Sequence, residues 1–351
     1  MSEVPLVSIV VNNFNYGRYV AAAIESALAQ SHPRTETIVV DDGSTDDSRS
    51  VVAGYGDRVR LLMKANGGQA SAINAGFALA RGDVVIFLDA DDMLLPGTAA
   101  AAADALRDAP RTVRVQFRVE VVDRDGRPTG ELIPAAYVTM PSGELGPGIA
   151  RFNNVTWWPP TSGHAFSARA LKDILPMPEE PFHVAVDYYL VRASTLSGPV
   201  VSLDRVGAYY RRHGDNEDSR DRLDLEQVRD QIELTRSAHG WLREFAKSRR
   251  LGPLAADADD VADLRYFAMR MMSRKLDPSR HPVAGDTLAG LALRGMRVAV
   301  EQTHLPWRVR VLAALWFLAV LSAPRGPARS LAEKYSYPQT RPRLGRILRR
   351  S

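Results

Sequence analysis

The sequence predicts an α/β fold with a mostly parallel sheet and helices on both faces, followed by a C-terminal helical subdomain. Short apolar runs end in polar clusters, and each run precedes a stretch with the apolar spacing of a helix. Strands that alternate with helices over about 30 residues form βαβ units, in which strands are parallel and crossovers right-handed. The expected strands are residues 7–11, 38–40 and 84–88, and the expected helices are residues 19–30, 47–55 and 69–80.

Polar side chains follow the first two expected strands at their carboxyl ends. The first strand is followed by Asn12 and Asn13, and the second by Asp41, Asp42 and Gly43. In open parallel sheets, ligands bind beyond the carboxyl ends of the strands. We therefore expect these polar clusters to line one crevice.

The third expected strand closes on Asp89, Asp91 and Asp92. Side chains two residues apart on a strand share a face, so Asp89 and Asp91 can point at one ligand. Paired carboxylates suit a divalent cation such as Mg²⁺ or Mn²⁺, which completes its shell with water and substrate phosphates. The alternative is an acidic turn that caps the following helix. The polar ends of the other two strands favour the ligand site.

The later part of the chain divides by composition. Residues 113–122 alternate as a strand, and residues 127–150 are rich in Pro and Gly, which predicts an irregular loop. Residues 223–249 and 257–275 have helical apolar spacing, and residues 277–286, with two prolines and a glycine, indicate a break. A helical subdomain is expected there.

The first hundred residues contain four short motifs, SIVVNNFN (8–15), IVVDDGSTD (38–46), NGGQASAINAGFALARGD (66–83) and FLDADD (87–92). In this order and spacing they resemble the start of a family 2 inverting glycosyltransferase with the GT-A fold. The resemblance covers residues 4–97 and extends to about residues 155–216. It implies a metal-dependent enzyme that moves a sugar, from a UDP-sugar foremost, to a hydroxyl in one displacement. Processive relatives carry a Q-x-x-R-W segment, which this sequence lacks, so a single addition is expected.

The resemblance assigns the donor site to the strand ends. Asp91 is the expected direct ligand of Mg²⁺ or Mn²⁺, and Asp89 is expected to contact the ribose, or the metal through water. Asp42 is expected to accept the imide hydrogen of a uracil-type base, because a carboxylate only accepts hydrogen bonds. Whether Asp41 or Asp42 turns inward stays open. Asn12 is expected to face the same pocket.

The expected catalytic base is Asp187, which matches the family's downstream carboxylate near the start of a helix. A carboxylate within hydrogen-bond reach can take the proton of the acceptor hydroxyl. The preceding residue is Val186, where the family often has a second carboxylate. The alternative is that Asp187 only caps the helix that follows.

Further residues are candidates by resemblance or by chemistry. The segment YRRH, residues 210–213, resembles a family segment that closes over the diphosphate. His213 could ligate the metal or donate to a phosphate, and Arg212 could pair with a phosphate through two hydrogen bonds; the alternative is a solvated loop. Trp157 and Trp158 are either an acceptor platform or core, and the role of His164 is open.

Four parts are expected: a nucleotide-sugar-binding half, an acceptor-binding half with the catalytic base, a helical subdomain, and a hydrophobic helix with a basic tail. These parts are residues 1–120, 121–222, 223–303 and 304–351.

The C-terminal part indicates a membrane surface. Residues 301–351 carry ten Lys or Arg and two Asp or Glu, and residues 309–323 are apolar on every side of a helix. About 15 residues are too few for an ordinary membrane span. We expect an anchor that lies in an anionic interface through residues 309–351. The alternative is a helix buried on the catalytic domain, with a solvated tail. Arginines without interleaved aromatics argue against nucleic acid.

The remaining features mainly exclude functions. The chain has no cysteine, so disulfides and thiolate sites are impossible. Its first residues lack a basic, apolar leader, so a cytoplasmic enzyme at the inner face of the membrane is expected, acting on a glycan or lipid-linked saccharide. The G-x-G-x-x-G turn of dehydrogenases and the GxxxxGK[ST] loop of P-loop enzymes are absent. A non-catalytic nucleotide-sugar-binding protein and a nucleotidylyltransferase-like enzyme are the alternatives, and the oligomeric state is open.

Overall fold

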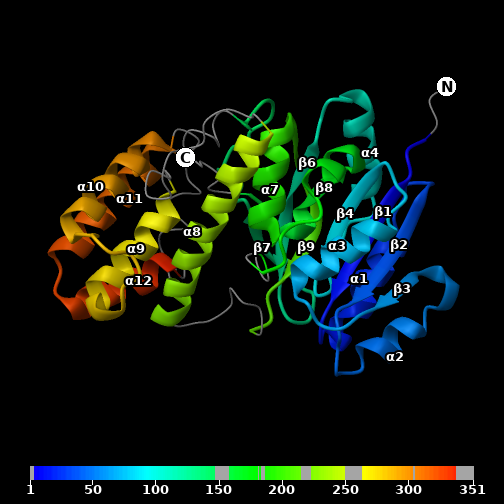
Figure 1. Cartoon of the computed structure of the whole chain (residues 1–351), viewed down its shortest axis with the longest axis horizontal. Helices are drawn as coiled ribbons and strands as arrows, with labels where there is room; N and C mark the ends of the chain where they lie inside the picture. Colours follow the sequence, from blue (N-terminus) through cyan, green and yellow to red (C-terminus); the bar gives the residue numbers. More distant parts are fainter. Residues whose placement is uncertain are drawn as a thin grey trace. The chain divides into compact units, whose positions relative to one another are not determined.

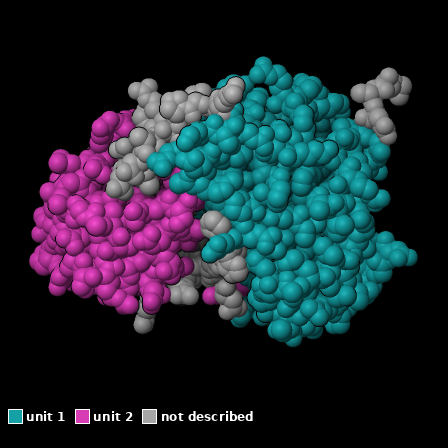
Figure 2. Space-filling view, viewed as in Figure 1, with its two compact units in different colours: residues 1–212, 240–256 teal, residues 213–239, 257–351 magenta. Residues whose placement is uncertain are grey.

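The computed structural model describes residues 4–146, 158–180, 182, 186–214, 223–249, 263–302 and 305–336. The chain forms two compact units (Figure 2). The first unit comprises residues 1–212 and 240–256, and the second comprises residues 213–239 and 257–351. The finer division into four parts stays a prediction.

The first unit is built on a mixed sheet, whose described strands follow the order β3-β2-β1-β4-β8-β6-β9-β5, with β7 beside β6 (Figure 1). Strands β1, β2 and β4 pair in parallel, as the sequence predicts, and β3, which was not predicted, pairs in parallel with β2. Strand β8 runs antiparallel to β4 and β6, so the other half of the sheet is mixed. The parallel strands are β1 (Val7–Asn13), β2 (Thr35–Asp41), β3 (Arg60–Met63) and β4 (Val84–Asp89). The others are β5 (Met93–Leu94), β6 (Arg114–Val122), β7 (Pro128–Ile133), β8 (His164–Ser167) and β9 (Val200–Arg211).

Helices cover both faces of the parallel strands, which explains why β1 is buried on both sides. Ile9 and Val11 share one buried cluster with Val20 of α1. Val10 points to the opposite face, because neighbouring side chains alternate along a strand, and meets Gly76 of α3 there. The predicted α/β fold is therefore confirmed. The helices are α1 (Gly17–Leu28), α2 (Ser48–Ala53), α3 (Gln69–Leu79) and α4 (Thr98–Asp108).

The second half of the first unit contains an aromatic cluster. The ring of Tyr189 lies 4.9 Å from that of Phe182 and 4.6 Å from that of Trp241, and the rings of Trp241 and Phe245 stack at 5.1 Å. The cluster joins α7 to residues 240–248 of the long helix α8. The helices are α6 (Ala168–Ile174), α7 (Val186–Ser197) and α8 (Leu225–Ser248).

The prediction of an irregular loop over residues 127–150 is wrong at its start. Strand β7 occupies part of it and pairs with β6 through a turn in which the Gly126 N–H donates to the Asp123 carbonyl. The side chains of β7 are largely exposed, and Pro128 is its first residue. Proline is tolerated at the start of an edge strand, so its presence does not exclude one.

The second unit is helical, as predicted. Its core gathers Ile232, Tyr266, Met272 and Ala332. Among the described residues no helix is long and apolar enough to cross a membrane. The unit contains the first part of α8 together with α9 (Leu264–Leu276), α10 (Leu288–Glu301), α11 (Trp307–Ser322) and α12 (Arg325–Ser336).

The close approach of α3 to the sheet gives a test of packing. A Cβ at Gly76 would lie 2.3 Å from Cγ1 of Val10 and 3.1 Å from Cγ2 of Val40. We expect Gly76→Ala to lower the free energy of unfolding by about 1–3 kcal/mol in urea titrations, because the helix has to move away. The control is Gly240→Ala in α8, where a Cβ meets nothing within 4 Å. It should stabilise the chain by up to about 1 kcal/mol, and equal effects of the two changes would contradict this packing.

Candidate active site

The register of the parallel strands brings the predicted polar residues together. Asn12 lies opposite Asp89 across β1 and β4, and Asn13 lies opposite Asp41 across β1 and β2. The Asn12 side-chain amide donates to Asp89 Oδ1 over 2.8 Å. Gln69, the first residue of α3, donates to the same oxygen over 2.9 Å. Two neutral amides therefore orient the Asp89 carboxylate without cancelling its charge.

Asp89 is the electrostatic centre of this group. Burial, repulsion from Asp91 and repulsion from Asp187 raise the pKa of Asp89 to about 7, although the hydrogen bonds from Asn12 and Gln69 oppose the shift. The repulsion means that the start of α7, which carries Asp187, lies within electrostatic reach of the end of β4. Asn12, Asp89, Asp91 and Asp187, all predicted site residues, thus share one region.

Asp92 and Arg211 support the loop that carries Asp91. Asp92 is fully buried, and one of its oxygens accepts from the Arg211 backbone N–H over 2.9 Å. Burial and the charges of Asp91 and Asp89 raise the pKa of Asp92 well above its ordinary value. The Arg211 guanidinium donates to the Asp91 carbonyl over 2.9 Å and to the Arg124 carbonyl over 3.0 Å. Arg211 therefore fixes the main chain of this loop.

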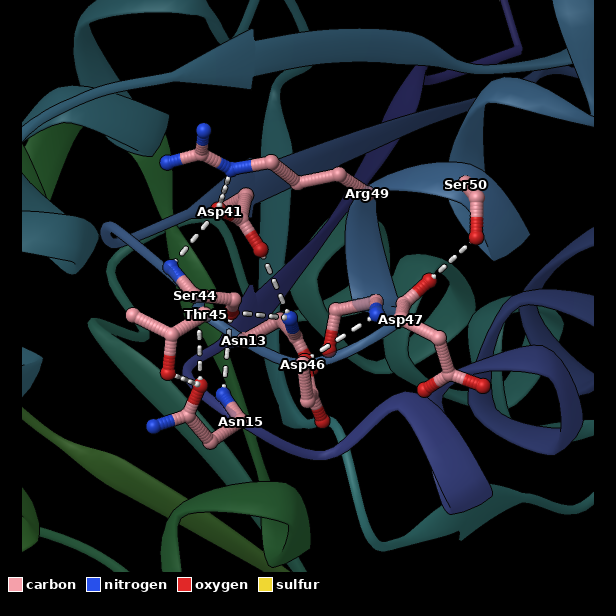
Figure 3. Close-up of polar contacts among 10 residues, drawn as sticks. Asn13, Asn15, Asp41, Ser44, Thr45, Asp46, Asp47, Arg49 and Ser50 are labelled. Carbon is pink, nitrogen blue, oxygen red and sulfur yellow. Dashed lines mark hydrogen bonds and ion pairs between the residues drawn. The ribbon is translucent and has the colours of Figure 1, made fainter.

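Asp41 builds the loop after β2, as Figure 3 shows. Its carboxylate accepts from the Asn13 amide over 2.9 Å, from the Ser44 backbone N–H over 3.0 Å and from Arg49 Nε over 3.2 Å. Burial disfavours the ionised form, but the bonds from Ser44, Asn13 and Arg49 outweigh it, so the pKa of Asp41 is lowered. Asp41 is fully buried, and its hydrogen bonds stabilise this loop.

Asp42, the expected base-reading residue, holds the loop before α3. Its carboxylate accepts from Lys64 Nζ over 2.6 Å and from the Gly68 backbone N–H over 2.8 Å. The Gly67 N–H lies 3.1 and 3.2 Å from its two oxygens. These bonds match the roughly four lone-pair positions of a carboxylate. A base that bonds to Asp42 therefore has to displace one of these donors.

Arg212 and His213 follow β9 and fall in different units. The Arg212 guanidinium forms two hydrogen bonds, of 2.9 and 3.2 Å, with the carboxylate of Glu131 on β7. His213 begins the second unit and is buried.

His164, the first residue of β8, lies in a buried polar cluster. Its Nε2 is 3.0 Å from the Pro159 carbonyl, which can only accept, so Nδ1 accepts from Arg114 over 2.9 Å. Burial and the charge of Arg114 lower the pKa of His164 well below its ordinary value. The Arg114 guanidinium also lies 4.2 Å from the Trp158 ring centroid. Trp157 lies outside the described residues.

Three residues of this region escape prediction from the sequence: Gln69, Lys64 and Arg211. Lys64 precedes Gly67 and Gly68 of the third motif and Gln69 follows them, so the position of this motif could have indicated both residues. Arg211 precedes the predicted Arg212, but only the fold shows that its guanidinium turns toward the Asp91 main chain.

The carboxylates fit a divalent cation by their chemistry. In the part of the chain that the structure describes, no group of three His, Asp or Glu side chains is arranged to hold a metal ion. Mg²⁺ usually takes one or two protein carboxylates and substrate phosphates, so Asp91 and Asp89 suffice. A bound cation would also offset the repulsion that raises the pKa of Asp89.

Comparison with known proteins agrees with this geometry. The family model for glycosyl transferase family 2 matches residues 8–171. An uncharacterized glycosyltransferase of Nostoc sp. is 34% identical over 216 residues, 60% of this chain and 66% of that protein. The hyaluronan synthase of Pasteurella multocida is 36% identical over 141 residues, which cover 39% of this chain and only 14% of the synthase. The chain belongs to glycosyltransferase family 2, which confirms the predicted resemblance.

The solved structures agree on the fold. S. aureus TarS 1-349, in complex with UDP-GlcNAc, superposes with a TM-score of 0.54 at 19% identity, covering 94% of this chain and 91% of that one. A mannosyltransferase of Pyrobaculum calidifontis, in complex with GDP-Man and Mn²⁺, gives a TM-score of 0.50 at 16% identity, covering 95% and 86%. The first unit has the GT-A fold, followed by a helical C-terminal region.

The raised pKa of Asp89 predicts a dependence of stability on pH. Between about pH 4 and 7 the native state keeps a proton that the unfolded chain releases, so stability is lost as the pH rises through this window. Asp89→Asn removes the charge and can still accept from Asn12 and Gln69. In metal-free buffer at pH 8 we expect this variant to be about 1–4 kcal/mol more stable than the parent chain.

The advantage should become small near pH 4, where Asp89 is protonated in the native state and, at its ordinary pKa of 3.8, about half protonated in the unfolded chain. Urea titrations at several pH values measure it, with the exposed Asp108→Asn as the control. A variant less stable than the parent at pH 8 would contradict the repulsion described here.

Proposed function

We propose that this chain is a metal-dependent inverting glycosyltransferase. It moves one sugar from a nucleotide-diphosphate sugar, a UDP-sugar foremost, to a hydroxyl of a glycan or lipid-linked acceptor. The observation that carries the proposal is the convergence of Asp89 and Asp91 with Asp187, in a chain of this family. Structural neighbours solved in complex with UDP-GlcNAc or with GDP-Man and Mn²⁺ support a nucleotide-sugar donor and a metal.

Asp91 and Asp89 would hold the cation. Mg²⁺ or Mn²⁺ supplies Lewis-acid stabilisation for the negative charge of the leaving diphosphate. Asn12 and Gln69 orient Asp89, and Arg211 fixes the backbone of Asp91. Because these supports are neutral amides and a main-chain contact, the charge of the Asp89 carboxylate stays available for the cation.

Asp187 is the proposed base. It lies in the first turn of α7, and the amino terminus of a helix favours negative charge. The acceptor hydroxyl loses its proton to Asp187 while its oxygen bonds to the anomeric carbon. The bond to the diphosphate breaks on the opposite side, and the diphosphate leaves with the electron pair. This single displacement inverts the configuration.

The proposed roles of Asp42, Arg212 and His213 lie at the nucleotide. Arg212 would pair with a phosphate; Glu131, one of its partners, is half-exposed, and partly exposed ion pairs contribute little, so a diphosphate can compete with Glu131. His213 would ligate the metal or donate to a phosphate. Asp42 would accept a hydrogen bond from the base if Lys64 or a backbone N–H of the loop gives up its own hydrogen bond to the Asp42 carboxylate.

The proposal also includes a location. The enzyme would act at the inner face of a membrane, held peripherally by its basic C-terminal part, where a lipid-linked acceptor is available. The second candidate function is a nucleotide-sugar-binding protein without turnover. It would need Asp89 and Asp91 but no carboxylate at the start of α7.

Asp187→Asn tests the proposed base. It keeps the shape of the side chain but cannot accept a proton, so turnover should fall about 10²-fold or more while donor affinity changes little. Release of UDP from a panel of UDP-sugars, with Mn²⁺ and an acceptor extract, measures turnover, and calorimetry measures donor binding.

The control is Asp104→Asn, an exposed aspartate on α4, which should behave as the parent chain. Undiminished turnover in Asp187→Asn, or loss of donor binding without loss of turnover per bound donor, would show that Asp187 is not the base.

A further inference from the structure

Helix α11 of the second unit exposes a row of large apolar side chains. We name it the apolar stripe; its members are 43% to 66% exposed. Most are spaced by three or four residues, so they lie on one face of the helix. They are Trp307, Val311, Leu312, Leu315 and Leu318.

The opposite face of α11 is already used for packing within its own unit. Phe317 and Val320 are buried, and a Cβ on Gly295 of α10 would lie 2.3 Å from the Phe317 ring. The Trp316 indole donates to the Leu331 carbonyl over 3.0 Å. The stripe is therefore not needed for the core. The buried face of α11 packs on helices of its own unit, and whether the exposed face is a membrane anchor stays a prediction.

The charges around the stripe are mainly positive. Helices α10 to α12 contain seven basic and two acidic residues, and both acids pair with arginine, Glu301 with Arg297 over 2.9 Å and Glu333 with Arg329 over 3.5 Å. Residues 337–351 add five arginines and no acid. A second copy of the chain would bring the same positive charge to this face and be repelled. The basic residues are Arg294, Arg297, Arg308, Arg310, Arg325, Arg329 and Lys334.

We infer that the apolar stripe lies in the interface of an anionic lipid membrane, with α11 parallel to its plane. Sixteen residues of α11 extend about 24 Å, less than the roughly 30 Å of a hydrocarbon core. Tryptophan favours the level of the headgroups, and arginine can bury its stem while its charge stays among them. Apolar burial and attraction to anionic headgroups thus act together. The inference extends the proposed membrane location but does not depend on glycosyl transfer.

Vesicle sedimentation of the full chain tests the surface. We expect binding to vesicles of phosphatidylcholine and phosphatidylglycerol, and much weaker binding to phosphatidylcholine alone. The double variant Leu315→Glu/Leu318→Glu should bind the anionic vesicles about tenfold less or weaker still, because two inserted side chains become charged.

The matched control is Val4→Glu/Met63→Glu in the first unit. It has the same change of net charge at side chains of similar exposure, 45% and 57%, and should bind as the parent chain. Thermal melts check folding, and Trp307→Glu is the second probe if the double variant unfolds.

Three results would overturn the inference. The first is that the parent chain does not bind anionic vesicles, and the second is that the double variant binds them as well as its control. The third is that the parent chain is a dimer in ultracentrifugation and the double variant is a monomer. The last would assign the stripe to self-association. Calorimetry with UDP distinguishes the membrane inference from the proposed donor site. A variant that has lost vesicle binding but keeps its affinity for UDP supports the role of the apolar stripe and shows that the donor site is intact.

Discussion

Mutual repulsion among buried carboxylates is the constraint on which this molecule depends. Asp89 and Asp92 lose hydration and feel the charge of Asp91, and Asp89 also feels Asp187. Such a group lowers stability at neutral pH unless something outside the chain neutralises it. The fold keeps the group together through rigid elements: parallel strands buried on both faces and in fixed register, a helix start at Gln69, and the Arg211 guanidinium on the loop backbone.

The carboxylates of this region differ in whether a cationic side chain compensates their charge. Asp41 is held by Arg49 and Asp42 by Lys64, together with backbone N–H groups, so their charges are compensated within the chain. Asp89 is held by two amides, which orient it and leave its charge. A lysine in place of Gln69 would stabilise the chain without ligand and compete with a cation. The neutral supports around Asp89 are therefore compatible with the proposed site for a cation and a diphosphate.

Much of this site follows from the sequence, because it depends on local patterns. Apolar runs that end in Asn12, Asp42 and Asp89 identify parallel strands, and the rule for ligands at their carboxyl ends brings those residues together. The roles of Lys64 and Arg211 depend on which way a long side chain turns, and no spacing encodes that. The dual character of α11 was equally hidden, since a segment apolar on all sides gives no indication of which face the other helices cover.

We propose that Asp89 and Asp91 hold a cation that binds the diphosphate of the donor. Calorimetric titration of UDP into the full chain, with Mn²⁺ and then with EDTA, tests it most directly. We expect the affinity for UDP to be at least about tenfold higher with Mn²⁺, and we expect Asp91→Asn to remove this difference without lowering the melting temperature in EDTA. Equal affinity of the parent chain for UDP with and without Mn²⁺ would show that these carboxylates hold no such cation.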